Sequence, residues 1–247
     1  MSCEDGNPGN TLSVDYLFKF ENGEEKRFRV DLSPETLQIL PPPAGELPEW
    51  TLLTYRQCPN CPLDQTKHKH CPVAVSLMDV IAGFGEATSY EWVEVTVRTK
   101  HRQYSKRTPL QYGVSALMGL IMVTSGCPWL DKLRPLVHSH LPFATVQETL
   151  YRFISMYLLA QYYLQEDGGT PDWKLERLPQ MFEDIGLVNK SFCQRLVGVT
   201  RTSDAINNAL VNLDCYALLS TMPLSDQMAS IRAMFHAWQN VDHQPGS

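Results

Sequence analysis

The sequence lacks the features that mark several common classes of protein. Its most apolar stretch, Val114–Val123, is far shorter than the roughly 20 residues that a membrane-spanning helix needs. Met1–Asn10 is polar and acidic, and so has neither the basic start nor the apolar stretch of a secretory signal. Lys and Arg total 21 against 27 Asp and Glu, a net charge of −6, which argues against a nucleic-acid partner. We therefore expect a cytoplasmic protein without a membrane partner.

The common sequence motifs of catalysis are missing as well. The chain contains no H-E-x-x-H, no G-x-S-x-G and no phosphate-binding P-loop. Its seven cysteines are an odd number, and with no secretory signal they favour a reducing compartment over a framework of disulfides. These absences leave open whether the protein is an enzyme.

The first half of the chain carries the patterns of antiparallel strands. Residues 11–20 alternate apolar and polar side chains, and so do residues 26–32 after the dipeptide Asn22-Gly23. Two alternating runs around Asn-Gly predict a hairpin, because both turn residues tolerate positive φ. The alternation at residues 92–99 and 103–107 predicts a second hairpin, and residues 50–55 are expected to form a further strand.

Helical patterns dominate after Pro109. A capping box at Thr145-Val-Gln-Glu148 predicts a helix through Leu164. Apolar spacing predicts the other helices at 73–84, 110–126, 172–198, 204–221 and 226–239. The order predicts an α+β fold, with a small antiparallel β-sheet in the N-terminal half packed against a mainly α-helical C-terminal half. A Gly-Gly-Thr-Pro linker suggests an α+β domain at 1–167 and a C-terminal helical region at 168–247, which we also regard as compatible with one domain.

Four of the seven cysteines are followed directly by proline: Cys58, Cys61, Cys71 and Cys127. We call them the four Cys-Pro cysteines. The first three have the spacing C-x2-C-x9-C in one polar loop, and a C-x-x-C turn lets two thiolates converge on one metal. Proline restrains the backbone on both sides of the Cys-Pro bond and so presets the ligand. The pattern predicts one metal centre with four thiolate ligands.

These ligands leave two kinds of centre open. Closely spaced cysteines with a terminal Cys-Pro are typical of ferredoxin-type sites, where each iron of a 4Fe-4S cluster takes one thiolate. The alternative is Zn²⁺ held by four thiolates, or by three thiolates and an imidazole. Zinc ribbons usually carry two C-x-x-C pairs and this chain has one, so we expect the 4Fe-4S cluster. Unligated core cysteines and disulfides are the non-metal alternatives.

Histidines near these cysteines are candidate auxiliary ligands. His68 and His70 lie in the same loop, and either imidazole could replace a thiolate on zinc or donate a hydrogen bond to a cysteine sulfur. A solvated Lys-His-Lys-His stretch is the alternative interpretation. Further along, His138, His140 and Glu148 form a candidate set for a metal-dependent hydrolase, although Glu148 also fits the capping box.

Three stretches of this sequence, CPNCPLDQTKHKHCP, TSGCPWLDKLRP and HLPFATVQETLYRFISMYLLAQYY, resemble a bacterial family known only as a domain of unknown function. The resemblance covers most of the first 165 residues. It implies that the four Cys-Pro cysteines belong to one motif set and that the source is bacterial. It implies no catalytic role.

Together these observations lead to the hypothesis of a cytoplasmic bacterial protein that binds a 4Fe-4S cluster through Cys58, Cys61, Cys71 and Cys127. We expect a role in electron transfer, redox chemistry or sensing, with a protein redox or regulatory partner. The two alternatives are a structural zinc-binding interaction module and the metal-dependent hydrolase built on His138, His140 and Glu148.

Overall fold

A computed structural model describes residues 11–40, 46–197, 199, 204–213, 228–229 and 231–239. By its internal contacts the chain divides into two compact units. The first combines Met1–Phe143 with Leu187–Asp214, and the second combines Ala144–Gly186 with Cys215–Ser247. The boundary between residues 167 and 168 that the linker suggested stays a prediction.

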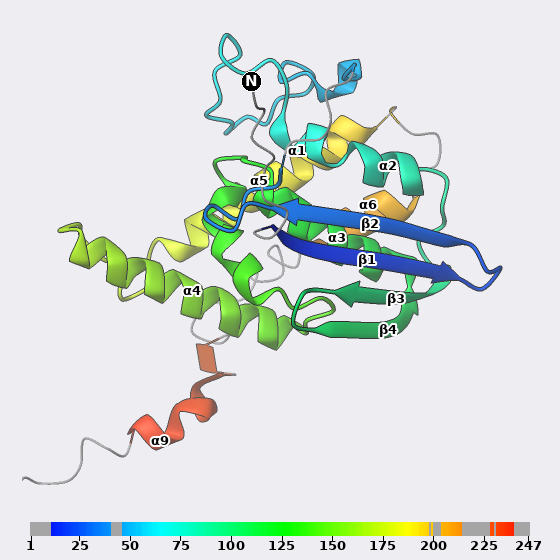
Figure 1. Ribbon diagram of the computed structural model, residues 1–247. Helices are drawn as coiled ribbons and strands as arrows, with labels where there is room; N and C mark the ends of the chain where they lie inside the picture. The colour runs from blue at the N-terminus through cyan, green and yellow to red at the C-terminus, as the bar shows by residue number, and fades with distance from the viewer. Residues whose placement is uncertain are drawn as a thin grey trace, which may run out of the picture. The chain divides into compact units, whose positions relative to one another are not determined.

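A four-stranded antiparallel sheet in the order β2-β1-β3-β4 forms the framework of the first unit (Figure 1). β1 (Leu12–Phe20) pairs with β2 (Glu25–Leu32), and β3 (Trp92–Arg98) pairs with β4 (Gln103–Pro109). Gly23 in the first turn has φ +88°, a conformation that glycine adopts without strain. Both predicted hairpins and the predicted α+β class are therefore confirmed.

Helix α3 (Leu110–Thr124) covers one face of this sheet at very short range. A Cβ placed on Gly113 would lie 2.7 Å from Val95 Cγ2 and 2.8 Å from the Phe18 ring, so only glycine allows this approach. Leu117 and Met118 of the same helix are completely buried, and α6 (Asp204–Leu213) packs against α3. The sheet and α3 therefore form the main core of the first unit.

The helix expected at residues 73–84 is divided in two. The structure has α1 (Pro72–Ser76) and α2 (Met78–Phe84), separated by Leu77 at φ −96° and ψ 0°. That ψ value lies outside the range of a continuous helix, which is why the prediction of one helix was wrong. The separation lets α2 turn its last residue, Phe84, towards the sheet, where its ring centroid lies 4.9 Å from that of Phe18.

The strand predicted at residues 50–55 was also wrong. The segment begins with a single 3-10 turn, η1 (Glu49–Thr51), and its only ladder contact within the described residues is a bridge between Leu52 and His70. The reason is a competing donor: the carbonyl oxygens of Trp50 and Leu52 accept hydrogen bonds from Arg195 Nη1 at 2.8 and 2.7 Å. Carbonyl oxygens that point towards this guanidinium do not point towards the N–H groups of a neighbouring strand, so no regular strand pairing forms here.

The capping box is confirmed at the start of α4 (Val146–Glu166). Glu148 N–H donates to Thr145 Oγ1 and the Glu148 carboxylate accepts from Thr145 N–H. The remaining described helices are η2 (Leu130–Ser139), α5 (Leu178–Leu196), η3 (Ala233–Phe235) and α9 (His236–Gln239). Parts of the helices predicted at 204–221 and 226–239 lie outside the described residues. Within the described part of the chain, no helix has both the length and the apolar character to cross a membrane.

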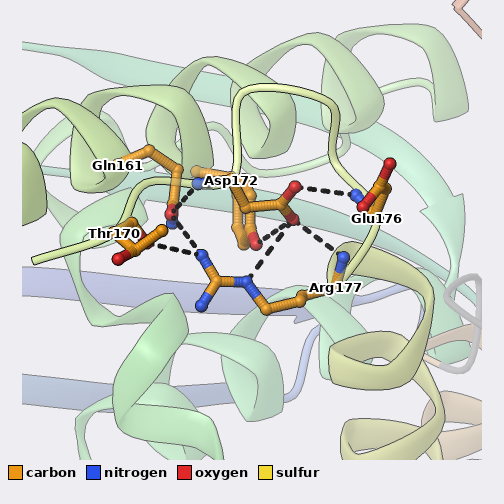
Figure 2. Close-up of polar contacts among 6 residues, drawn as sticks. Gln161, Thr170, Asp172, Glu176 and Arg177 are labelled. Atoms are coloured by element: carbon orange, nitrogen blue, oxygen red, sulfur yellow. Dashed lines mark hydrogen bonds and ion pairs between the residues drawn. The ribbon is translucent and has the colours of Figure 1, made fainter.

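Helix α5 begins at Leu178, six residues later than predicted. The reason is that the Asp172 side chain binds backbone N–H groups just before the helix. The Asp172 carboxylate accepts hydrogen bonds from the N–H groups of Glu176 at 3.0 Å and Arg177 at 2.8 Å. The Tyr157 hydroxyl donates to the same carboxylate at 2.9 Å. Residues 172–177 therefore form a turn around one carboxylate instead of the first turns of a helix (Figure 2).

The side chain of Arg177 completes this arrangement in the second unit. Its Nη2 donates to Thr170 O at 3.0 Å and to Gln161 Oε1 at 3.3 Å, and its Nε lies 3.8 Å from Asp172 (Figure 2). Burial acts to raise the pKa of Asp172, but the N–H groups of Arg177 and Glu176 and the Tyr157 hydroxyl outweigh burial and lower it. The carboxylate is therefore held in its ionised form.

We predict that Gly113→Ala lowers the free energy of unfolding by about 1–3 kcal/mol, despite the higher helix propensity of alanine, because the added methyl group overpacks Phe18 and the stiff Val95. Gly119→Ala on the same helix is the matched control, since its Cβ would meet only the flexible end of Leu213 at 2.9 Å. Denaturant unfolding measures both changes. An equal effect of the two substitutions would contradict the close approach of α3 to the sheet.

We predict that Asp172→Asn destabilises the turn at residues 172–177 by about 1–3 kcal/mol at pH 7, because two part-buried N–H groups and the buried Tyr157 hydroxyl lose a charged acceptor. The folded pKa of Asp172 lies below its unfolded value of about 3.9, so its stabilisation is present above that pH and is lost as the pH falls towards the folded pKa. The difference in amide exchange at Glu176 and Arg177 between variant and wild type should therefore be largest at pH 7 and shrink as the pH falls below about 3.9. A difference that does not depend on pH would contradict a role for the ionised carboxylate.

Candidate metal centre

The loop that carries three of the four Cys-Pro cysteines is closed at its base by backbone hydrogen bonds. Cys71 N–H donates to Thr51 O at 2.8 Å, and Leu53 N–H donates to Lys69 O at 2.9 Å. Residues 51–71 therefore leave the body of the first unit and return to the same place. This closure brings Cys71 back to the foot of the segment that leads into the C-x-x-C turn.

A side chain from a distant segment connects this turn to Cys127. Cys61 N–H donates to Cys58 O at 3.0 Å, which closes the C-x-x-C turn. Trp129, two residues after Cys127, donates a hydrogen bond from its indole Nε1 to Asn60 O inside that turn at 2.6 Å. Segments that lie 69 residues apart in the chain are thus joined at the cysteine positions.

The buried thiol of Cys127 interacts electrostatically with the loop thiols. Burial raises the pKa of Cys127 to about 11, while the N–H groups of Leu130 and Trp129 act in the opposite direction. Negative charge on Cys71 and on Cys58 raises this pKa further. Cys127 therefore belongs to the same electrostatic environment as two of the loop cysteines.

Cys71 has a similar environment at the start of α1. Burial raises its pKa, and charge on Cys61 adds to the increase. The N–H groups of Ala74 and Val73 and the charge of Arg195 favour the thiolate. At both Cys71 and Cys127, therefore, the N–H groups two and three residues beyond the cysteine stabilise negative sulfur, while the intervening proline contributes no N–H.

Cys58 faces helix α5. Burial raises its pKa, charges on Cys71 and Cys61 raise it further, and both Ser191 and Arg195 lower it. Ser191 and Arg195 are four residues apart on α5, and side chains at that spacing share one face of a helix. The same helical face therefore supplies a hydroxyl and a cation to the cysteine region.

The guanidinium of Arg195 is almost entirely buried, with 2 % of its side chain exposed. Nη1 donates to Trp50 O and Leu52 O, Nη2 donates to Arg56 O at 3.4 Å, and the cation lies 5.8 Å from the centre of the Tyr55 ring. Ion pairs within 4 Å involve other residues throughout the described chain, and none of them includes Arg195. Arg195 thus fastens α5 to the base of the cysteine loop, and its charge favours the thiolate forms of Cys58 and Cys71.

The four Cys-Pro cysteines are free thiols, with Cys127 buried and the other three partly exposed. Charge on some of these cysteines raises the pKa of others, so the four share one electrostatic environment. Across the described residues, however, no three His, Cys, Asp or Glu side chains are grouped so as to hold a metal ion. The identity of the four residues as metal ligands therefore stays a prediction.

The two loop histidines have different surroundings. His68 is exposed, as a solvated loop residue would be. His70 Nδ1 lies 2.8 Å from Thr51 Oγ1, and the Thr51 hydroxyl donates its hydrogen to Pro48 O at 2.7 Å. Since that hydroxyl hydrogen is already used, Nδ1 of His70 is the donor and Nε2 carries the lone pair.

Two residues of the predicted hydrolase site, His140 and Glu148, have structural partners. His140 Nε2 lies 2.7 Å from the hydroxyl of the buried Tyr16 in the first unit. Glu148 belongs to the second unit, where contacts with Thr145 lower its pKa. A hydrolase site made of His138, His140 and Glu148 stays a prediction.

Sequence reasoning missed two residues that organise the candidate centre. Arg195 had a detectable signal, because it lies three and seven residues after the buried Phe192 and Val188 and therefore on the apolar face of its helix. Trp129 had a weaker one, namely its position two residues after a Cys-Pro cysteine. Neither signal identifies the partner, since carbonyl oxygens of a loop leave no mark in a sequence pattern.

Comparison with known proteins gives one match. A family model described as a domain of unknown function (DUF6901) matches residues 14–236, which extends well beyond the 165 residues expected from the resemblance. No curated protein and no solved structure matches the chain. The resemblance to a family of unknown function is confirmed, and the four cysteines as its shared motif stay a prediction.

We predict that Trp129→Phe loosens the C-x-x-C turn, because it removes the indole donor to Asn60 O and keeps most of the ring. Losing one such hydrogen bond costs about 1 kcal/mol, which should accelerate amide exchange at Cys61 roughly fivefold if exchange follows local opening. Trp92→Phe on β3 is the matched control, since Trp92 is half exposed in the sheet. Unchanged protection at Cys61 would show that Trp129 does not fasten the turn.

Proposed function

The chain belongs to the family described as a domain of unknown function, DUF6901, and we propose that it binds a 4Fe-4S cluster through Cys58, Cys61, Cys71 and Cys127. In this proposal the protein works in the cytoplasm, in electron transfer, redox chemistry or sensing. Its partner is a redox or regulatory protein. The proposal rests on the chemistry of the chain's own residues, because the family carries no assigned activity.

The observation that carries the proposal is the hydrogen bond from Trp129 Nε1 to Asn60 O. Cys127 follows α3, whereas Asn60 lies inside the C-x-x-C turn, and this bond joins the two segments directly. The packing of α3 accounts for the burial of Cys127, but it gives no reason for a C-x-x-C turn to be bonded to the residues that follow. A centre with four thiolate ligands supplies that reason, because it requires the lone cysteine to meet the other three.

The environment of the sulfurs also supports a centre made of thiolates. Burial disfavours charge on the isolated thiols, and yet Arg195 and the N–H groups beyond Cys71 and Cys127 all favour negative sulfur. These groups would stabilise thiolates more than neutral thiols, as a metal centre requires. Such donors tune the reduction potential of iron–sulfur centres.

A cluster accounts for the spacing of the ligands better than a single ion. In a 4Fe-4S cluster each thiolate binds a different iron, so the sulfurs are spread over a larger volume than the four sulfurs of a zinc site, which all lie about 2.3 Å from one ion. The thiols of this chain interact electrostatically across three segments, which is compatible with that larger spread.

One observation favours a second candidate, a structural zinc-binding interaction module. The hydrogen-bond chain from His70 Nδ1 through Thr51 to Pro48 O leaves Nε2 as the atom with a lone pair. Metal-binding imidazoles are commonly held in this way, with one ring nitrogen bonded to the protein and the other to the metal. Zinc with three thiolates and His70 is therefore the competing centre.

We predict that protein purified without oxygen is brown and contains iron and acid-labile sulfide, and that Cys127→Ser lowers its iron content at least about tenfold, as expected when a ligand is removed. Cys193→Ser is the matched control: Cys193 lies on α5 and points about 200° away from Ser191 around the helix. Elemental analysis and visible absorbance measure the outcome.

Other results separate the alternatives. A colourless protein with one zinc per chain would replace the cluster by the zinc module, and loss of that zinc in His70→Ala would identify the fourth ligand. A protein that holds neither metal after purification and anaerobic reconstitution would overturn the proposal in both forms. Iron retained by Cys127→Ser at the wild-type level would overturn the four-cysteine ligand set.

A further inference from the structure

The described part of the chain buries one full positive charge without a carboxylate beside it. Arg195 is 2 % exposed, and its hydrogen bonds end on the carbonyl oxygens of Trp50, Leu52 and Arg56. Carbonyl dipoles and the Tyr55 ring solvate a cation in part, but they do not neutralise it. A buried arginine in such a setting calls for an anionic partner.

The position of this charge is fixed. Its three acceptors all lie within residues 50–56, which run from η1 to the start of the C-x-x-C turn, so the guanidinium is bound to the base of the cysteine loop. A planar guanidinium that donates in several directions is held more firmly than a lysine ammonium would be. The charge of Arg195 acts on both Cys58 and Cys71 and favours their thiolate forms.

The chemistry of the proposed centre supplies the missing anion. Four thiolates around Zn²⁺ or around an oxidised 4Fe-4S core leave two net negative charges, and reduction of the cluster adds a third. In a buried setting such charge needs compensation from the protein. Arg195 donates to Arg56 O, two residues before Cys58, and to Leu52 O, next to the residue whose carbonyl accepts from Cys71 N–H.

We propose that Arg195 is the built-in counter-cation of the four-cysteine centre: it stabilises the bound anionic metal–thiolate complex and, where that complex is a 4Fe-4S cluster, its reduced state. This inference rests on the proposed metal binding and adds to it a residue that touches no metal. Arg195 is a positioning and charge-compensating residue, because it acts through the thiolates and the loop.

The test separates the charge of Arg195 from its shape by measuring the metal affinity of two variants of the full chain. Arg195→Met removes the charge and keeps much of the apolar stem, whereas Arg195→Lys keeps the charge and loses the planar fork. Lys67→Met is the control, because it removes one positive charge from an exposed position of the same loop. Each protein is loaded with the metal found in the wild type, and its affinity is measured by competition with a chelator.

We expect Arg195→Met to bind its metal roughly tenfold to a hundredfold more weakly, the usual range for residues that support metal ligands. Arg195→Lys should stay within about threefold of wild type, and Lys67→Met should be unchanged, since exposed charges are screened. If the metal is a cluster, Arg195→Met should also shift its midpoint potential to more negative values. A purely structural brace would leave that potential in place.

Each further outcome decides the matter. Wild-type affinity in Arg195→Met would overturn the inference while metal binding stands. If Arg195→Lys loses as much metal affinity as Arg195→Met, Arg195 acts only as a structural brace. If Arg195→Met does not fold, the metal affinity of Arg195→Lys relative to wild type decides between the two roles. A wild-type chain that holds no metal would overturn the proposed function itself, and the inference with it.

Discussion

The structure of the cysteine region depends on one buried guanidinium. Arg195 collects three carbonyl oxygens from a segment that has no regular secondary structure beyond a single 3-10 turn. Buried carbonyls need donors, and here one side chain from α5 supplies what a neighbouring strand would otherwise supply. The loop at residues 51–71 can therefore be irregular and still have a defined path. Its cysteines are placed by this anchoring and by the backbone bonds at its base.

The second constraint is the close fit of α3 to the sheet. Because Gly113 lets the helix approach Val95 and Phe18, the direction of α3 is set by the sheet. The chain leaves this helix at residues 125–127, so the position of Cys127 follows from the same packing. Trp129 then extends the placement to the C-x-x-C turn through Asn60. Sheet, helix and loop thus form one continuous path of contacts inside the first unit that ends at the sulfurs.

The sequence predicted those parts of the fold that short-range patterns control. Asn22-Gly23 and the alternating strands around it specify their hairpin locally, and the capping box at Thr145 and Glu148 specifies the start of α4. Predictions failed where a polar side chain forms hydrogen bonds with the backbone, as a donor in one case and as an acceptor in the other. Arg195 diverts the carbonyls of the expected strand at 50–55, and Asp172 holds the N–H groups that would have begun α5 earlier. For the candidate centre, the cysteines were visible as a pattern, whereas the hydrogen bond from Trp129 to Asn60 and the burial of Arg195 follow only from tertiary structure.

The order of strands has a consequence for association between molecules. β2 and β4 are the edges of the sheet, and the end of β2 is covered, because Leu32 forms a bridge with Ile39 and Leu40 N–H donates to Asp31 O at 2.8 Å. β2 carries Lys26, Arg27 and Arg29, and β4 carries Lys106 and Arg107. Four of these five cations form ion pairs with carboxylates of the same chain. A second copy that paired with either edge would have to remove water from these charged side chains, and charged edge strands therefore disfavour edge-to-edge association.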